Sequence, residues 1–254
     1  MERGVATLER KPSKRGIVIC LAAAVLFMSL SGIYFYATGQ RFITAMSPQT
    51  ETDHILLIID PGHGGADGGA VSITGVNESE INLAIALRLE ALAALYGLPT
   101  EMTRRTEDID YPEDANTIRA KKVADTRARV TLINEASNAV VISIHQNTYA
   151  GASVSGPQVL FARTDASEAF AVNMQDALTQ SLGLERPRTP VKVPQGVYLM
   201  NHIDVPAILV ECGFLSNPQE ESLLRTEVYQ LRLASALLAG YVQSLELLQA
   251  RYFG

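Results

Sequence analysis

The sequence has few cysteines and no general surplus of basic residues, and both shortages narrow what the protein can be. Only two of the 254 residues are cysteines, and Cys20 lies inside a long apolar run. A disulfide framework of the kind that holds small secreted proteins together is therefore excluded. With 47% hydrophobic and 19% charged residues, the chain has enough apolar material to form a core.

Excess positive charge is confined to the start of the chain. Residues 1–15 carry five basic and two acidic side chains, a net charge of +3, so the remainder carries −9 of a total of −6. An acidic domain without a basic patch does not fit a nucleic-acid-binding protein, and we expect no nucleic-acid partner. No repeat with a period of about 20 to 50 residues occurs, so a solenoid is not indicated.

An uncharged segment of 22 residues, GIVICLAAAVLFMSLSGIYFYA, follows the basic tail. About 20 apolar residues span a bilayer as a helix, and basic residues before the span keep the tail in the cytoplasm. We expect a cytoplasmic tail (1–15), a transmembrane signal-anchor in the cell membrane (16–37), a linker (38–53) and a domain outside the cytoplasm (54–254). The alternative is a cleaved signal peptide and a secreted domain, but the apolar part of such peptides is shorter, about 7 to 15 residues.

The outer part of the chain alternates between short β-branched runs and longer helical patterns. Strand candidates are 55–59, 140–144 and 208–210, with weaker ones at 100–103 and 158–162. Helix candidates are 81–96, 117–135, 167–181 and 220–248, and in the first of these Leu83, Leu87 and Leu95 share one helical stripe. Strands alternating with helices indicate an α/β fold with a mostly parallel sheet.

Each of the three strongest strand candidates leads into a side chain that can bind a metal ion or transfer a proton. The first leads to His63, the second to His145 and the third to Glu211. In open α/β sheets, ligands bind outside the carboxyl ends of the strands. The sequence therefore predicts that three distant segments deliver these side chains to one site.

His63 lies in a glycine-rich segment, DPGHGGADGGA, whose five glycines in eight residues allow a ligand to approach closely. The alternatives are a flexible turn or a phosphate-binding loop. The segment lacks the Lys-Ser/Thr pair of a Walker loop and has no Gly-x-Gly-x-x-Gly at a helix start. Nucleotide binding is therefore disfavoured.

Two histidines are too few for a catalytic zinc site, which usually takes three protein ligands. Glu78 and Glu80 both lie close to the start of the next helix, where a carboxylate can also serve only to complement the helix dipole. His54 and His202 are weaker candidates, because the first precedes a strand and the second lies in a polar turn. From these residues alone, the choice between the two glutamates stays open.

Glu211 lies between the apolar run AILV and the residues CGF, so its carboxyl group should be largely buried. A buried carboxylate is costly unless it has a partner or a task. A nearby cation or a role as general base would supply one, and a salt bridge to a helix arginine is the structural alternative. Cys212 points to the other strand face, and we expect it to pack in the core.

Five blocks in the same order resemble the zinc-dependent N-acetylmuramoyl-L-alanine amidases of bacterial cell walls. They are DPGHGGADGGA, ESEINLAIAL, the TR pair at 103–104, RVTLINEASNAVVISIHQN and VPAILVECGFLSNPQE. The resemblance as a whole covers Ile55 to about Tyr241. The resemblance implies a single α/β domain with a mostly parallel central sheet of about six strands flanked by helices. It also implies one zinc ion as cofactor and peptidoglycan as substrate.

The resemblance implies residue roles as well. In the family, the zinc-binding glutamate opens a Glu-x-x-x-Asn-Leu block, which matches Glu78 and not Glu80. His63 and His145 match the two histidine ligands. Glu211 matches the catalytic glutamate, which is expected to take a proton from zinc-activated water.

Two further residues, Arg104 and Asn147, fall in matching blocks and are candidates for substrate binding. The implied reaction is hydrolysis of the amide between N-acetylmuramic acid and the L-alanine of the stem peptide. SIHQN and ECGFLSNPQE are most similar to the branch that acts on spore-cortex peptidoglycan during muramic-δ-lactam formation. The alternatives are a zinc carboxypeptidase or deacetylase acting on another wall bond, and a non-catalytic wall-binding module with structural zinc.

Overall fold

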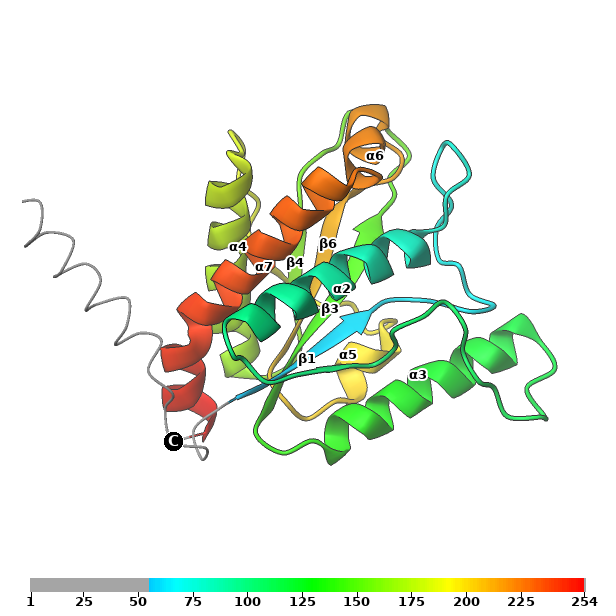
Figure 1. Ribbon diagram of the computed structural model, residues 1–254, viewed down its shortest axis with the longest axis horizontal. Helices are drawn as coiled ribbons and strands as arrows, with labels where there is room; N and C mark the ends of the chain where they lie inside the picture. Colours follow the sequence, from blue (N-terminus) through cyan, green and yellow to red (C-terminus); the bar gives the residue numbers. More distant parts are fainter. Residues whose placement is uncertain (1–54, 254) are drawn as a thin grey trace, which may run out of the picture. The chain divides into compact units, whose positions relative to one another are not determined.

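This computed structural model describes residues 55–253, which fold around a six-stranded sheet (Figure 1). The strand order is β2-β1-β3-β6-β4-β5. The strands are β1 (Leu56–Pro61), β2 (Thr100–Met102), β3 (Ala139–Asn147), β4 (Gln158–Phe161), β5 (Val191–Lys192) and β6 (Ala207–Phe214). Strand β4 pairs with β6 antiparallel and every other pairing is parallel, which confirms a single α/β domain with a mostly parallel sheet.

Helices cover both faces of this sheet (Figure 1). They are α2 (Glu78–Leu95), α3 (Ile118–Glu135), α4 (Asp165–Leu182), α5 (Tyr198–His202), α6 (Pro218–Leu224) and α7 (Glu227–Leu248), followed by a π-helical turn (Gln249–Phe253). Helices α2, α4 and α7 pack on one face, and α3 and α5 contribute to a second core on the other. Side chains of β1 alternate between these cores, with Leu57 and Ile59 in the first and Ile58 in the second. Burial on both faces explains why the central strands are continuous apolar runs.

The long helix predicted over residues 220–248 is two helices, and that prediction was wrong. Helix α6 is capped by Asn217, whose side chain accepts hydrogen bonds from two backbone amides. Helix α7 has its own cap, because the hydroxyl of Thr226 accepts from the amide of Tyr229. A threonine in this position starts a new helix even where the apolar periodicity continues through it.

The apolar stripe predicted for the first helix is not the face that packs against the core. Leu95 is 76% exposed and Leu87 is 38% exposed, whereas Ile81, Ile85 and Leu89 are buried. Helix α2 carries apolar residues on more than one face, so periodicity could not select the face that packs. The short elements β5 and α5 were not predicted, because two and five residues are too few to show a period.

The predicted tail, signal-anchor and linker lie outside the described residues, as does His54. Within residues 55–253, none of the helices combines the length and apolar character needed to cross a membrane.

Candidate metal centre

Three segments converge near the carboxyl ends of the central strands. The loop that carries His63 follows β1, while His145 and Glu211 are register partners on the neighbouring parallel strands β3 and β6. Both strands run past these two residues, to Asn147 and Phe214, so the side chains lie within strands instead of directly after them. The predicted convergence is confirmed for all three residues.

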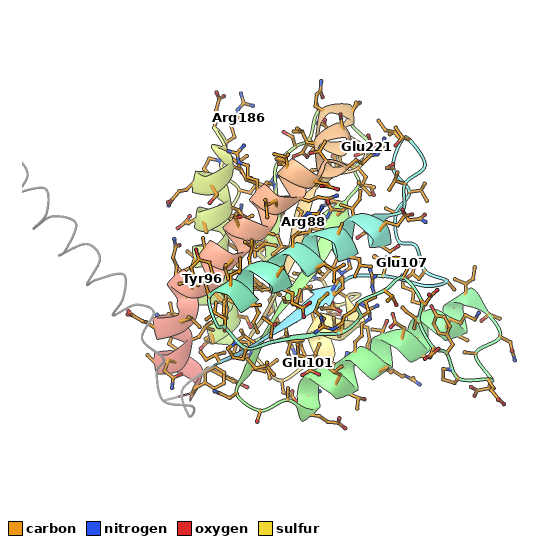
Figure 2. The ribbon with its side chains drawn as sticks, in the orientation of Figure 1. Arg88, Tyr96, Glu101, Glu107, Arg186 and Glu221 are labelled. Carbon is orange, nitrogen blue, oxygen red and sulfur yellow. The ribbon has the colours of Figure 1, made fainter. Side chains whose placement is uncertain are left out.

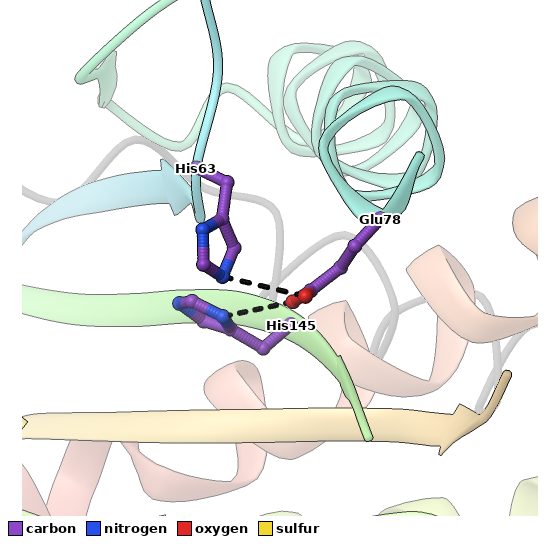
Figure 3. Close-up of side chains that lie close together, drawn as sticks. All are labelled: His63, Glu78 and His145. Atoms are coloured by element: carbon purple, nitrogen blue, oxygen red, sulfur yellow. Dashed lines mark hydrogen bonds and ion pairs between the residues drawn. The ribbon is translucent and has the colours of Figure 1, made fainter. Parts of the chain in front are cut away.

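Two histidines and one carboxylate meet at this edge (Figure 3). His63 Nε2 lies 3.3 Å from Glu78 Oε2, and His145 Nδ1 lies 3.0 Å from Glu78 Oε1. One ligand atom from each residue lies within 4.8 Å of the other two, and no other such group occurs among the described residues. Two imidazoles and a carboxylate form a donor set that zinc accepts while keeping one position open. The residues present therefore fit a catalytic zinc ion.

Glu78 and Glu80 differ clearly in their surroundings. Helix α2 begins at Glu78, whose side chain is buried and faces the two histidines, whereas Glu80 is exposed and accepts a hydrogen bond from Asn77. Burial alone would raise the pKa of Glu78, but the hydrogen bond and charge of His145, together with the charge of His63, lower it to about 2. Glu78 is thus ionised at neutral pH and ready to bind a cation.

Two glycines make room for the ligand side chains. A Cβ atom on Gly62 would lie 2.2 Å from the ring of His145. One on Gly69 would lie 2.6 Å from Oε2 of Glu78, and the φ of +71° at this residue also disfavours any other residue type. The glycine-rich segment thus admits the protein's own ligands to close range.

The two histidines present different ring nitrogens to Glu78. His63 Nδ1 lies 2.9 Å from the carboxylate of Asp67, which leaves its Nε2 for the site, whereas His145 uses Nδ1. A carboxylate on the far nitrogen fixes the orientation of a metal-binding histidine. Burial alone would raise the pKa of Asp67, but hydrogen bonds and charges from Lys122 and His63 lower it to about 2. Asp67 was not predicted, although its place four residues after His63 was the available signal.

Glu211 has the environment of a proton acceptor. Burial raises its pKa to about 7; the charge of His145 opposes this shift and that of Glu78 adds to it. Its Oε2 is buried without a hydrogen-bond partner. The salt bridge to a helix arginine, which the sequence left as an alternative, does not occur among the residues that the structure describes.

The two candidates for substrate binding have different surroundings. Arg104 is 7% exposed, and its guanidinium donates to the carbonyls of Pro61, Gly62 and Ser79. These contacts support the loop that carries His63. Asn147 is partly buried at the end of β3. Contact of either residue with substrate stays a prediction.

Within residues 55–253, His202 and Cys212 are the histidine and the cysteine that take no part in the site. His202 is exposed and stacks on Tyr198 with ring centroids 3.8 Å apart. Cys212 is fully buried in the first core, and this burial raises the pKa of its thiol far above the ordinary value, so the thiol is unreactive.

Residues 57–242 match a protein family described as N-acetylmuramoyl-L-alanine amidase. The chain belongs to this amidase family. A curated relative, the germination-specific N-acetylmuramoyl-L-alanine amidase of Bacillus subtilis (strain 168), is 35% identical over 189 residues, which cover 74% of this chain and 78% of the relative. The resemblance inferred from the five sequence blocks is thereby confirmed.

Longer amidases and solved structures are also similar. The amidase AmiC of Neisseria meningitidis serogroup B is 29% identical over 73% of this chain, which spans only 51% of that relative. The structure of the CwlD amidase from Clostridioides difficile, solved in complex with the GerS lipoprotein, superimposes with a TM-score of 0.73 at 30% identity. This match covers 76% of the present chain and 100% of the CwlD chain.

Proposed function

We propose that this amidase is zinc-dependent and hydrolyses the bond between N-acetylmuramic acid and L-alanine with His63, Glu78 and His145 as metal ligands. The observation that carries the proposal is the meeting of their three ligand atoms within 4.8 Å of one another. When bound, a zinc ion supplies a Lewis acid that polarises a carbonyl and makes water more acidic.

The chain's own groups divide the remaining tasks. Glu78, ionised at neutral pH, contributes the negative charge of the ligand set, while Asp67 holds His63 with Nε2 toward the site. Glu211 takes a proton from the attacking water and delivers it to the departing amine of L-alanine. In the metal-free protein, burial raises the pKa of Glu211 to about 7, so its carboxyl group is suited to accepting and releasing a proton.

The cellular role we propose is removal of stem peptides from spore-cortex peptidoglycan, on the way to muramic-δ-lactam. Two similar proteins support this choice: one is named germination-specific, and the other is the CwlD amidase. The proposed location is the outer side of the cell membrane, held by residues 16–37. The uncharged length of this segment supports an anchor, with a secreted domain as the other outcome.

The decisive experiment is digestion of purified peptidoglycan by the full chain in detergent, with chelator, without it and after zinc is added back. Mass spectrometry should find glycan strands freed of stem peptides and peptides with new L-alanine amino termini, only when zinc is present. Release of D-alanine or acetate would favour a carboxypeptidase or deacetylase, and binding without products a wall-binding module. Comparing rates on cortex and vegetative peptidoglycan tests the cortex role, since equal rates would contradict a cortex preference.

A further inference from the structure

Helix α3 is held on the domain by few apolar contacts. Of its 18 residues only Arg129 and Ile133 are buried, and two further apolar side chains are partly buried against the second core. Two of its large apolar side chains, Ile118 and Val123, are 67% and 42% exposed. Since most helices in proteins are stabilised by packing an apolar face, polar contacts must contribute much of what keeps α3 in place.

Arg129 makes the most extensive of these polar contacts, and they extend from the end of β1 into the loop that follows. Its Nη1 donates to Asp60 Oδ1 at 2.9 Å and to the carbonyl of Pro61 at 2.8 Å. Its Nη2 donates to the carbonyl of His63 at 2.7 Å. A single buried guanidinium thus binds three of the four residues from Asp60 to His63.

Asp125, one turn earlier on α3, fixes the direction of this guanidinium. Its carboxylate accepts from Arg129 Nε at 3.0 Å and lies 2.9 Å from Nη2. Contacts of this forked kind give an arginine a defined orientation as well as charge compensation. The arginine is therefore held from one side by its own helix and bound on the other to the loop.

The backbone of His63 is strained, which makes such a contact consequential. His63 has a φ of 62°, and only one other non-glycine residue in the described part of the chain has a positive φ. A strained backbone conformation of this kind persists only where the surroundings hold it. The bond from Arg129 to the His63 carbonyl is one such restraint, at the residue whose side chain we assign to the metal.

A second side chain of α3 reaches the other end of the same loop. Lys122 lies seven residues before Arg129, two helical turns away and on the same face. Its Nζ lies 2.8 Å from Asp67 Oδ2, the same oxygen that lies 2.9 Å from His63 Nδ1. Lys122 is 53% exposed, so its contribution is smaller than that of the buried arginine.

We infer that helix α3 positions His63 for metal binding, with Arg129 as the positioning residue. The inference rests on the proposed function, because it requires His63, Glu78 and His145 to hold a metal ion. Arg129 touches the loop and not the ligand atoms, so it acts through the backbone of His63. By linkage, a metal ion bound at His63 stabilises the docked helix as much as the docked helix favours the metal.

The first test is the zinc affinity of the full chain, measured in detergent by competition with a chromophoric chelator. Arg129→Met should weaken zinc binding about tenfold or more, as expected when a group that holds a metal ligand is removed. Arg129→Lys should recover part of the loss, because an ammonium group can still pair with Asp60 and donate to a carbonyl. The matched control is Arg127→Met, which removes the same charge from an exposed position of the same helix and should bind zinc like the wild type.

A second variant and a second measurement support this test. If Arg129→Met does not fold, Asp125→Asn takes its place. It leaves the pair between Arg129 and Asp60 intact and should weaken zinc binding, by a smaller factor than the loss of the arginine. In the wild type, amide hydrogen exchange over residues 118–135 should slow when zinc is added. This readout does not depend on hydrolysis.

The outcomes separate the inference from the proposed function. Equal zinc affinity of the Arg129→Met variant and the wild type, or of Asp125→Asn where it is used instead, would overturn the inference. A lower melting temperature would not rescue it, because a purely structural arginine would lower stability without changing the affinity of the folded protein. An amide hydrogen exchange rate in α3 that does not change when zinc is added would contradict the inference as well. A wild-type chain that binds no zinc would instead overturn the proposed function.

Discussion

The surroundings of two carboxyl groups at the site shift their pKa values in opposite directions. Hydrogen bonds and the charges of two histidines outweigh burial at Glu78 and lower its pKa to about 2. Burial dominates at Glu211 and raises its pKa to about 7. Such a separation assigns the first group to permanent charge and the second to proton transfer. Both assignments can be tested by single substitutions.

Glu211→Gln removes the proton acceptor and keeps the size of the side chain. We expect turnover to fall about 10²- to 10⁴-fold, the usual contribution of a general base, while zinc is retained. Hydrolysis of purified peptidoglycan and metal analysis of the same sample would measure both. His63→Ala is the comparison, since it should lose zinc and activity together. A Glu211→Gln variant with full activity would exclude the assigned role.

Glu78 and Glu80 offer a matched pair for testing the third ligand. Glu78→Gln should weaken zinc binding by at least about 100-fold, because it removes a charged ligand from a site with only three. Glu80→Gln, two residues along the same helix, should bind zinc normally because its carboxylate is exposed and faces Asn77. Chelator competition measures both affinities. The reverse result would place the ligand at Glu80.

The raised pKa of Glu211 predicts how the stability of the metal-free protein varies with pH. A group whose pKa is higher in the folded state contributes stability that is present below the unfolded value, here 4.5, and is lost as pH rises through about 7. Between pH 4 and 8, urea unfolding should show Glu211→Gln gaining about 2–3 kcal/mol relative to the wild type. A difference that does not change with pH would mean that Glu211 titrates normally.

The sequence predicted the site residues whose side chains bind metal ions or transfer protons. It missed the residue whose role depends on which face of a helix is buried. His63, His145 and Glu211 follow or end apolar runs, so their convergence could be inferred. The choice of Glu78 over Glu80 came only from the family resemblance. Arg129 was missed because its role depends on which face of an otherwise polar helix turns inward, which a single sequence does not specify.

At the scale of elements, the segment before Glu78 is tied to helix α6. Figure 2 labels Glu221 on α6, and its side chain is 2% exposed. The side chains of Ser72 and Thr74 both donate to its Oε1. Arg225, the C-cap residue of the same helix, donates to Thr74. These contacts join two segments that are 147 to 151 residues apart in sequence, and they restrain the turn that leads into α2.

Glu221→Ala should therefore destabilise the fold by about 1–3 kcal/mol, because it leaves two hydroxyl groups without their acceptor. Urea unfolding of the zinc-free protein would measure the loss. Glu227→Ala is the control. The Glu227 side chain is 90% exposed, its carboxylate lies as far as 4.0 Å from Arg88 Nη2, and such surface pairs contribute about 0–1 kcal/mol. Equal losses of unfolding free energy in the two variants would show that the hydrogen bonds to Glu221 do not stabilise the fold.

The elements themselves were predicted where periodicity and length were clear. Strands β1, β3 and β6 were recognised because burial on both faces makes them continuous apolar runs. The break between α6 and α7 was missed because its signal is one capping threonine, Thr226, inside an unbroken apolar period. The packing face of α2 was wrong because α2 is apolar on several faces, and only the position of the neighbouring helices decides which one is buried.

At the scale of the whole molecule, parallel pairing explains why one site forms from distant segments. Strands β1, β3 and β6 are consecutive neighbours in the sheet, although about 80 and 60 residues of sequence separate them. The fold class and the shared site edge were therefore predictable from the order of strands and helices. The antiparallel pairing of β4 was not, because nothing local in its four residues specifies strand direction.

The location of the whole chain in the cell can be tested together with the independence of its catalytic domain. The described residues 55–253 belong to one compact unit, so a chain lacking residues 1–51 should fold and hydrolyse peptidoglycan at the rate of the full chain. The full chain, expressed in bacteria, should remain in the membrane fraction after alkaline carbonate washing, because 22 uncharged residues bury enough apolar surface to resist extraction. Protease added outside spheroplasts should degrade the domain and spare the basic tail. Intact mass distinguishes the alternative: a product lacking its first residues and found in the medium would mean that residues 16–37 act as a cleaved signal peptide.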